Sequence, residues 1–436
     1  MIILKNKIID YLDNKKILIL GFGREGKSAY KFIKDNLKNY KLGIADINEI
    51  NIDDDSVKLH IGENYLESTK EYDLVIKSPG IIIKDYITDI EKQKITSLTD
   101  LFLRFCDNTI IGVTGTKGKS TTASLIHHIL VSCGKKSLLI GNIGIPAFSV
   151  LEELEKDTIL VYELSCHQLE YITKSPHISI LLNLYEEHLD HYVGIEGYIR
   201  AKTNIYRYQT ENDYLIYGDI WKYIDKKEFS KIKSKLIDIN NNDLNINYED
   251  IETSLVGDHN KKNIITALLA VRLVGINIEE GLKSVKTFKP LEHRMEFVGE
   301  YKKIKFYNDS IATAQEAVIN AVKSLKDVDT IIIGGMDRGL DYTLLVEFLS
   351  TSSVNNIILL PSTNSRIEKM FNDYKINKNI ICVNNMDEAV KMSYKYTKPN
   401  KICLLSPAAA SYGFYLNFEK RGEHFKDLVK YYANNR

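Results

Sequence analysis

The sequence lacks the features that mark membrane, secreted and nucleic-acid-binding proteins. Its 58 Lys and Arg residues balance 58 Asp and Glu residues, so no broad basic field for nucleic acid or membrane phosphates is expected. No window approaches the ~18 apolar residues of a membrane span, and the first residues carry too short an apolar run for a signal peptide. We therefore expect a soluble, cytoplasmic protein that acts on small molecules and binds neither nucleic acid nor membrane.

Cysteine is also scarce. The chain has five cysteines, an odd number, and no two of them form a C-x-x-C pair. This pattern argues against a disulfide framework and suits reduced thiols in a cytoplasm. The length of 436 residues suggests two to four domains.

The most informative stretch is Thr109–Thr122, which reads TIIGVTGTKGKSTT. A buried strand is expected over residues 110–113, and a helix is expected to begin near Lys119. Backbone N–H groups and the positive end of the helix dipole then converge on one point, where a phosphate group is the natural ligand. The stretch therefore predicts a nucleoside triphosphate site.

The side chains of this stretch suit the same ligand. Glycines allow the backbone to approach phosphate oxygens, a lysine can reach the terminal phosphates, and a hydroxyl can bind Mg²⁺. These residues are Gly115, Gly118, Lys119 and Ser120. The spacing departs from the full Walker form, which has glycine where this chain has Val113.

A second glycine motif lies near the start of the chain. Residues 15–20 form a buried-strand pattern, and Gly21-Phe-Gly-Arg-Glu-Gly26 then opens a helix through Leu37. Asp46 follows the next expected strand, residues 42–45. The motif fits a nicotinamide site with Asp46 on the ribose, a different nucleotide-diphosphate ligand, or a structural turn, and the motif alone does not decide among them.

Alternating strands and helices in the middle of the chain call for a parallel sheet. Glu163 and His188 each follow an expected strand and so belong at the sheet edge that carries Ser120. This grouping suggests a second metal ion, although a core or capping histidine is the ordinary alternative. By position alone, Lys202 on the helix at 194–207 is a solvated lysine. Asn260 and Asn263, one turn apart, either read an adenine edge or cap a helix.

A third αβ series follows a boundary near residues 290–295. It opens with an expected hairpin over residues 295–307 that turns near residues 299–302. Polar loops then follow successive strands at the ligand-binding edge. These loops are Asn308–Thr313, Gly334–Arg338 and Ser406–Ser411.

Together these stretches resemble the Mur ligase family over nearly the whole chain. The motifs that carry the resemblance occur in order: TGTKGKSTT at 114–122, GNIG at 141–144, Glu163-Leu-Ser-x-x-Gln-Leu-Glu170, Asn183-x-x-Glu-Glu-His-Leu-Asp-His191, Ala201-Lys202, His259-Asn260, His293-Arg294, Ser406-Pro-Ala-x-Ala-Ser411 and Asn417-Phe-Glu-x-Arg-Gly422. Such an ordered set is highly specific.

The resemblance implies a three-domain α/β fold. Residues 1–105 would form a Rossmann-like domain for a UDP-sugar, residues 106–292 a central P-loop ATPase domain with a mostly parallel sheet, and residues 293–436 a Rossmann-like domain for an amino acid. The implied activity is ATP-dependent addition of glutamate, with D-glutamate favoured, to UDP-N-acetylmuramoyl-L-alanine. An acyl phosphate forms on the way, ADP and phosphate are released, and the product is a peptidoglycan precursor.

The resemblance also implies roles for individual residues. ATP would bind Gly115, Thr116, Lys117, Gly118, Lys119, Ser120, Thr121, Asn260, Asn263, Arg294 and Asp309. The UDP-sugar would bind Gly21, Phe22, Gly23, Arg24, Asp46, Ser78, Pro79, Gly80 and Asn142. The amino acid would bind Thr313, Arg338, Ser411 and Phe418. Catalysis would depend on Lys119, Glu163, His188 and Lys202.

Two Mg²⁺ ions are implied by the resemblance as well. Ser120 and Glu163 would hold one ion and His188 the second. Lys202 would carry a carbamate formed with CO₂, which helps to organise the second ion. Here the resemblance overrides the interpretation of Lys202 as a solvated lysine.

One departure from the family pattern affects substrate choice. The family usually has Asp-Ser-Lys-Ala-Thr-Asn where this chain has Asp309-Ser-Ile311-Ala-Thr313-Ala314. L-glutamate therefore remains an alternative to D-glutamate. Another Mur ligase or a folylpolyglutamate-type ligase would share the ATP core. A noncatalytic nucleotide-dependent interaction protein is a further alternative, and the presence of Lys119, Glu163, His188 and Lys202 argues against it. We expect a monomer that takes small-molecule substrates.

Overall fold

The computed structural model describes most of the chain and divides it into two compact units. The described residues are 2–83, 92–143, 145–152, 154–185, 192, 194–244, 246, 251–255, 257–289, 292–325, 327–337, 339–374 and 378–434. The first unit comprises residues 1–253 and 259–288, and the second comprises residues 254–258 and 289–436. Within the described ranges, no helix has the length and apolar content needed to cross a bilayer.

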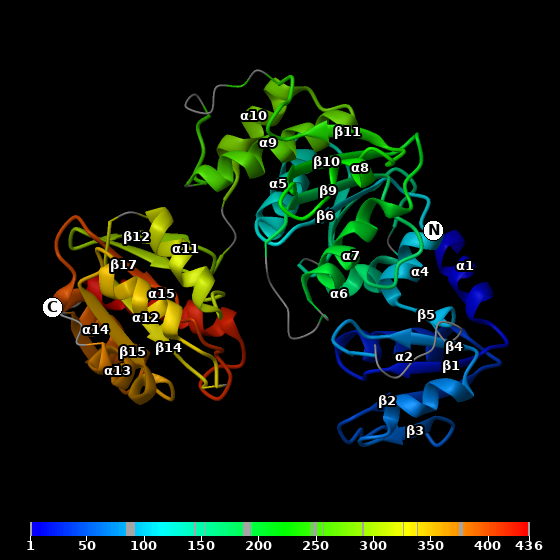
Figure 1. Ribbon diagram of the computed structural model, residues 1–436, viewed down its shortest axis with the longest axis horizontal. Helices are drawn as coiled ribbons and strands as arrows, with labels where there is room; N and C mark the ends of the chain where they lie inside the picture. The colour runs from blue at the N-terminus through cyan, green and yellow to red at the C-terminus, as the bar shows by residue number, and fades with distance from the viewer. Residues whose placement is uncertain are drawn as a thin grey trace. The chain divides into compact units, whose positions relative to one another are not determined.

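Sheet A, in the first unit, is parallel with the strand order β3-β2-β1-β4-β5 (Figure 1). Its strands are β1 (Lys16–Leu20), β2 (Lys41–Asp46), β3 (Lys58–Ile61), β4 (Leu74–Lys77) and β5 (Ile95–Thr96). Residues 17–20 of β1 are fully buried, as expected for a central parallel strand with both faces covered. The loops at the carboxyl ends of β1, β2 and β4 carry the predicted UDP-sugar residues other than Asn142.

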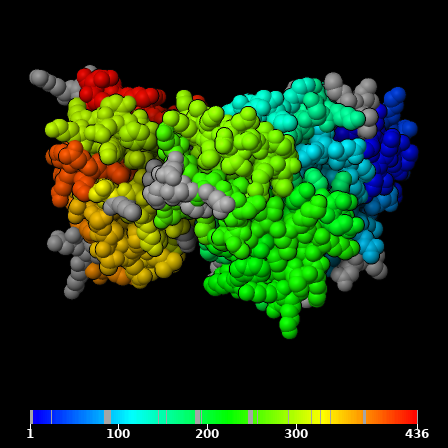
Figure 2. All heavy atoms as spheres, turned by 90° about the horizontal axis from the view of Figure 1, so that it is seen from above, coloured from blue at the N-terminus to red at the C-terminus, as the bar shows by residue number. Residues whose placement is uncertain are grey.

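The first helix was not anticipated from the sequence. Helix α1 (Ile2–Leu12) buries Leu4, Ile8 and Leu12, which are four residues apart and therefore share one face. The helix packs on α4 (Leu98–Phe105), and Lys7 pairs with Asp107 at 2.6 Å. In Figure 2 the blue residues of α1 lie directly against the cyan residues around position 100.

Sheet B, also in the first unit, has six parallel strands in the order β11-β10-β9-β6-β8-β7. They are β6 (Ile110–Thr114), β7 (Ser137–Gly141), β8 (Ile159–Glu163), β9 (Ile178–Asn183), β10 (Tyr214–Asp219) and β11 (Lys235–Asp238). Helix α5 (Lys119–Ser132) packs on β7 and β8, and α7 (Gly194–Arg207) packs on β9. The carboxyl ends of β6, β8 and β9 therefore meet at one edge, as predicted.

Sheet C forms the second unit and is mixed, with the order β12-β13-β17-β14-β15-β16 and an antiparallel pair at β12–β13. The strands are β12 (Glu296–Tyr301), β13 (Ile304–Asn308), β14 (Val328–Gly334), β15 (Asn356–Leu360), β16 (Asn379–Cys382) and β17 (Ile402–Leu405). The hairpin turn lies at Lys302 and Lys303, slightly later than predicted. Gly299, with φ of 149°, instead lies at a bulge within β12.

Sheet C is covered on both faces. Ile331 and Ile333 of β14 pack with α11 (Gln315–Leu325), α12 (Thr343–Thr351) and α13 (Asn364–Asp373). Ile332 faces the other way and packs with α14 (Met386–Tyr396) and α15 (Phe418–Asn434). Burial on both faces explains the unbroken apolar run of β14.

The remaining elements are short or connect the sheets. They are α2 (Arg24–Asn36), α6 (Cys166–Leu169), α8 (Lys226–Phe229), α9 (Asp258–Leu273), α10 (Ile278–Thr287) and the 3₁₀ turns η1 (Tyr65–Glu71) and η2 (Ala147–Val150). The predicted α/β fold with two parallel sheets and a third Rossmann-like sheet is confirmed. Sheets A and B share one compact unit, so the predicted domain limit at residues 105–106 stays a prediction.

Candidate active site

The phosphate loop, residues 115–118, joins β6 to α5 in the predicted way. Gly115 has φ of 154° and Gly118, the residue before the helix, has φ of 86°, both in the region that favours glycine. Asn183 at the end of β9 fixes the loop from the side. Its amide nitrogen donates to the Lys117 carbonyl at 3.0 Å, and its amide oxygen accepts from the Lys117 N–H at 2.9 Å. The loop is therefore held in shape by the sheet.

Two lysines meet at this loop. The Lys119 ammonium donates to the carbonyls of Gly115 and Thr116 at 3.0 and 2.9 Å. The Lys202 ammonium donates to the same Gly115 carbonyl at 2.8 Å, although Lys202 is only 2% exposed. Two ammonium groups on one oxygen repel each other. Binding of an anion beside the Gly115 carbonyl, or loss of one of the two positive charges, would therefore relieve the repulsion.

Glu163 lies at the end of β8, beside the loop, and is fully buried. Its Oε1 accepts from the Asn142 amide at 3.0 Å, whereas Oε2 has no hydrogen-bond partner among the described residues. Ser120, also buried, lies in the first turn of α5. A buried carboxylate oxygen without a donor among the described residues, at the same sheet edge as the predicted phosphate site, fits a hard cation such as Mg²⁺. Among the described residues, no group of three or more His, Cys, Asp or Glu side chains gathers here or elsewhere.

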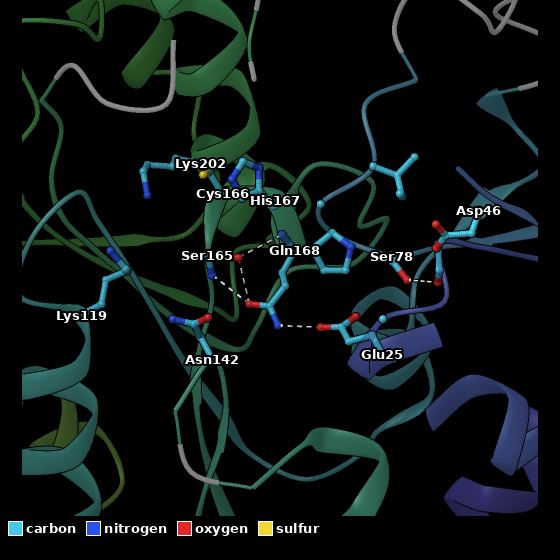
Figure 3. A pocket seen from close by; sticks show the side chains of 15 residues that line it. Glu25, Asp46, Ser78, Lys119, Asn142, Ser165, Cys166, His167, Gln168 and Lys202 are labelled. Atoms are coloured by element: carbon cyan, nitrogen blue, oxygen red, sulfur yellow. Dashed lines mark hydrogen bonds between the residues drawn. The ribbon is translucent and has the colours of Figure 1, made fainter. Parts of the chain in front are cut away.

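A cavity of about 600 Å³ in the first unit joins the loops of sheet A to those of sheet B. In Figure 3, Lys119 and Lys202 lie at one end, and Asp46 and Ser78 lie at the other. The predicted residues that line it are Gly21, Gly23, Asp46, Ser78, Pro79, Gly80, Lys119, Asn142 and Lys202. The fold thus brings the predicted UDP-sugar loops and two predicted catalytic lysines to one cavity.

The loops of sheet A are tied together at this cavity. The Asp46 carboxylate accepts from the Phe22 N–H at 2.7 Å, and the Ser78 hydroxyl donates to the Gly21 carbonyl at 2.7 Å. The fold thus gives Asp46 a structural role in the glycine turn, whichever ligand the turn binds. The side chain of Arg24, a predicted UDP-sugar residue, lies outside the described part of the chain.

Sequence reasoning missed several residues of this cavity. Glu25, Ser165, Cys166, His167 and Gln168 line it, and none of them was predicted as a site residue. Gln168 donates to Glu25 at 3.3 Å and forms a capping box with Ser165 at the start of α6 (Figure 3). The Ser-x-x-Gln spacing directly after a strand was the available signal, because it marks a helix start at the ligand-binding edge.

Asn260 and Asn263 lie behind the phosphate loop. The Asn263 oxygen accepts from the Thr122 hydroxyl at 3.2 Å, and its nitrogen donates to the Asn260 oxygen at 2.9 Å. A Cβ atom on Gly118 would lie only 2.6 Å from the Asn263 oxygen, so the loop and α9 pack closely. Contact of the two asparagines with adenine stays a prediction.

The second unit carries the remaining predicted ligands at the carboxyl edge of sheet C. Asp309 and Thr313 lie in the loop after β13, Ser411 lies after β17, and Phe418 begins α15. A hydrogen bond of 2.9 Å from the Ala408 N–H to the Ala312 carbonyl joins the first two loops. Arg294 precedes β12 and is half-buried. Two further predicted residues, His188 and Arg338, lie outside the described part of the chain.

Asp309 makes the stability of the protein depend on pH. Burial raises the pKa of its carboxyl group from 3.8 to about 7, against hydrogen bonds from the Ser406 hydroxyl and the Met295 N–H. Between about pH 4 and pH 7 the folded state keeps a proton that the unfolded state has lost. The stability contribution of Asp309 therefore falls as pH rises through this window, and the cost of the buried charge is complete above pH 7.

We expect Asp309→Asn to stabilise the second unit by about 1–3 kcal/mol at pH 8 and to change little at pH 4. Calorimetric melting at both pH values measures this difference. Asp373→Asn at the exposed end of α13 is the control for the same substitution outside the buried loop. An equal shift for Asp309→Asn at both pH values would show that the native carboxyl is already ionised at pH 4.

Comparison with known proteins agrees with this architecture. The sequence model of one protein family, described as Mur ligase middle domain, matches residues 113–271. A second family model, described as Mur ligase, glutamate ligase domain, matches residues 293–409. The chain belongs to the Mur ligase family, a family of ATP-dependent ligases. It is 32% identical to a protein named UDP-N-acetylmuramoylalanine--D-glutamate ligase from Clostridium botulinum (strain Langeland), over 97% of this chain and 98% of that one.

Other relatives give the same result. The protein of the same name from Clostridium kluyveri (strain ATCC 8527) is 32% identical over 96% of this chain and 97% of its own length. Among solved structures, MurF from Acinetobacter baumannii has a TM-score of 0.60 at 16% identity and covers 97% of this chain and 92% of its own. MurF from Thermotoga maritima, in complex with ADP, has a TM-score of 0.58 at 16% identity and covers 98% and 97%. These structures support the fold.

Proposed function

We propose that the chain joins D-glutamate to UDP-N-acetylmuramoyl-L-alanine at the expense of ATP, and releases ADP and phosphate. The observation that carries the proposal is the shared cavity. Lys119 of the phosphate loop and Lys202 line the same 600 Å³ space as the glycine turn after β1 and the Ser78–Gly80 turn. A sugar nucleotide held by those turns can therefore present its carboxylate to the γ-phosphate of ATP. The substrate named for the relatives supports this acceptor and this amino acid.

The chemistry proceeds by an acyl phosphate. A carboxylate oxygen of the sugar nucleotide attacks the γ-phosphorus, and ADP leaves. The glutamate amine, having lost a proton, then attacks the acyl carbon, and phosphate leaves as the amide forms. The protein positions the reactants and neutralises their charge. In this proposal, the loop N–H groups and Lys119 hold the β- and γ-phosphates.

Metal ions supply further charge neutralisation when bound. Ser120 and Glu163 fit one Mg²⁺, since Glu163 Oε2 is buried and has no donor among the described residues. His188 would bind the second ion. A carbamate on Lys202 forms when its neutral amine adds CO₂ and releases a proton, which replaces a cation with an anion. The ammonium groups of Lys202 and Lys119 both donate to the Gly115 carbonyl and repel each other. A carbamate on Lys202 removes this repulsion, which supports the proposed modification.

Glutamate would bind at the edge of sheet C. Ser411, Thr313 and the N–H groups that begin α15 at Phe418 would meet its carboxylates, together with Arg338. Ile311 and Ala314 lie in the same loop as Thr313 and bring no charged or hydrogen-bonding side-chain group. The remaining ATP contacts of the proposal, Arg294 and Asp309, also belong to this unit. Substrates of this kind are cytoplasmic, and we propose a cytoplasmic monomer.

The proposal predicts a preference for D-glutamate. With equal concentrations of the two enantiomers and UDP-N-acetylmuramoyl-L-alanine as acceptor, we expect ADP release to be at least about tenfold faster with the D form. Inversion at the α-carbon moves the α-carboxylate away from its partner. The tenfold ratio corresponds to loss of one charge-assisted hydrogen bond to that carboxylate. A tenfold preference for L-glutamate would assign the L enantiomer instead, and inactivity with both would reject glutamate.

The double variant Ile311→Lys, Ala314→Asn is the matched control. It restores the side chains usual in the family at this loop. If the loop contacts the amino acid, this variant changes the ratio of the two rates while the KM for ATP stays constant. An unchanged ratio would show that residues 311 and 314 do not determine which enantiomer reacts.

A further inference from the structure

The closing sequence Asn417-Phe-Glu-Lys-Arg421-Gly422 leads into helix α15, and its arginine is only 1% exposed. The Arg421 guanidinium donates three hydrogen bonds. Nε reaches the Ser310 hydroxyl at 3.0 Å, Nη2 the Ser310 carbonyl at 2.8 Å and Nη1 the Ala409 carbonyl at 3.0 Å. The Ser310 hydroxyl in turn donates to the Phe418 carbonyl at 2.8 Å. The Arg421 side chain thus binds the loop after β13 and the loop after β17, and Ser310 connects it to the start of α15.

A third loop lies against the same guanidinium. A Cβ atom on Gly335, in the loop after β14, would lie 3.1 Å from Arg421 Nη1 and 2.5 Å from the Ala410 carbonyl. The Met336 N–H donates to that carbonyl at 2.9 Å. The three loops that meet around Arg421 are therefore the ones that sequence analysis selected as ligand loops of this sheet.

The neighbouring glycine explains how α15 comes so close. A Cβ atom on Gly422 would lie 2.2 Å from His293 Nδ1 and 2.9 Å from the Asn308 amide nitrogen. The helix can therefore pack directly against the end of β13 only with glycine at this position. This contact fixes the rotation of α15 and directs Arg421 beneath the loops.

The charge of Arg421 has no counter-ion among the described residues. All three of its acceptors are neutral, and no described carboxylate forms an ion pair with it. Burial lowers the pKa of Arg421 to about 10, so it stays charged at neutral pH. A buried cation without a paired anion lowers stability. Packing alone therefore does not explain why arginine occupies this position.

We infer that Arg421 is a positioning residue for the amino-acid substrate. It holds the loops that carry Thr313 and Ser411 in place, and its buried charge favours an incoming dicarboxylate over a neutral amino acid. The inference rests on the proposed function, because that function puts glutamate at these loops. It assigns to the closing Arg-Gly sequence a part in substrate binding in addition to packing.

Steady-state kinetics of Arg421→Met and Arg421→Lys test the inference. Arg421→Met keeps the length of the side chain and removes the charge, so we expect the KM for D-glutamate to rise about tenfold or more. The KM values for ATP and the sugar nucleotide should stay within about twofold. Arg421→Lys keeps the charge without the planar fork and should be intermediate. Lys420→Met, one residue earlier and exposed, is the control for net charge and should match wild type.

Amide hydrogen exchange gives a second readout that does not depend on activity. We expect faster exchange in Arg421→Met at residues 309–313 and 408–411, with the first unit unchanged. Exchange that accelerates throughout the second unit, or an equal rise in all three KM values, would reduce Arg421 to a structural role. An unchanged KM for D-glutamate would overturn the inference.

The two tests also separate this inference from the proposed function. If Arg421→Met does not fold, Arg421→Lys carries both measurements. If the wild type ligates no glutamate, the proposed function fails, and the inference fails with it as regards substrate. The exchange data would then still report whether Arg421 organises the loops.

Discussion

Lys119→Ala is expected to reduce ADP formation by about 10²–10³-fold or more while the fold stays intact. The ammonium group lines the cavity and donates to carbonyls of the phosphate loop. Its loss therefore removes positive charge from the proposed γ-phosphate position but few packing contacts from the hydrophobic core. ADP release in a coupled assay measures the rate. Melting within about 2 °C of wild type verifies the fold.

Lys136→Ala provides the comparison. Lys136 lies in the same unit, before β7, and is half exposed beside Glu155. We expect its loss to leave turnover unchanged. If Lys119→Ala turned over at the rate of wild type, residues 115–118 would not be the ATP site.

Lys202→Ala is expected to be nearly inactive and to regain activity with a small anion. Lys202 is buried, so alanine leaves a space beside Tyr198, whose ring centre lies 4.9 Å from the ammonium. Formate, acetate or high bicarbonate can place a carboxylate in that space and replace the proposed carbamate. We expect rates to rise by about tenfold or more with saturating anion.

Lys202→Arg is the matched variant for this test. Its guanidinium fills the space and does not form a carbamate, so added anions should restore it much less than the alanine variant. A carbon-13 carbamate signal from labelled bicarbonate should appear in wild type and be absent from both variants. Full activity of Lys202→Ala, or a wild type without that signal, would remove the carbamate from the mechanism.

The sequence predicted those parts of the site that depend on short stretches of chain. The phosphate loop follows from a buried strand, two glycines and a helix start, and all of these lie within residues 109–122. The positions of Glu163 and Asp46 at strand ends were also predicted from local sequence, because parallel strands present their carboxyl ends at one edge of a sheet. These local patterns were enough to place the glycine turn, the Ser78–Gly80 turn and Lys119 at the cavity, whereas Asn142 and Lys202 came from the family resemblance.

Other parts depend on contacts between distant residues. Arg421 meets Ser310 across 111 positions and Gln168 meets Glu25 across 143, and no local pattern reports either pairing. Helix α1 has apolar residues at helical spacing, but its short length gave little signal. Lys202 shows the same limit, since its burial against Gly115 contradicts the solvated position that its helix alone suggested.

The hydrogen bonds from Lys119 to the loop carbonyls have a further consequence for product release. In this conformation the two carbonyls compete with an incoming anion for the Lys119 ammonium. A single phosphate must displace two hydrogen bonds to enter, whereas a nucleoside triphosphate offers many more oxygens to the loop N–H groups in return. If residues 115–118 bind ATP as proposed, this exchange disfavours weak anions. In the proposed reaction, the return of Lys119 to these carbonyls would favour departure of the inorganic phosphate before the next turnover.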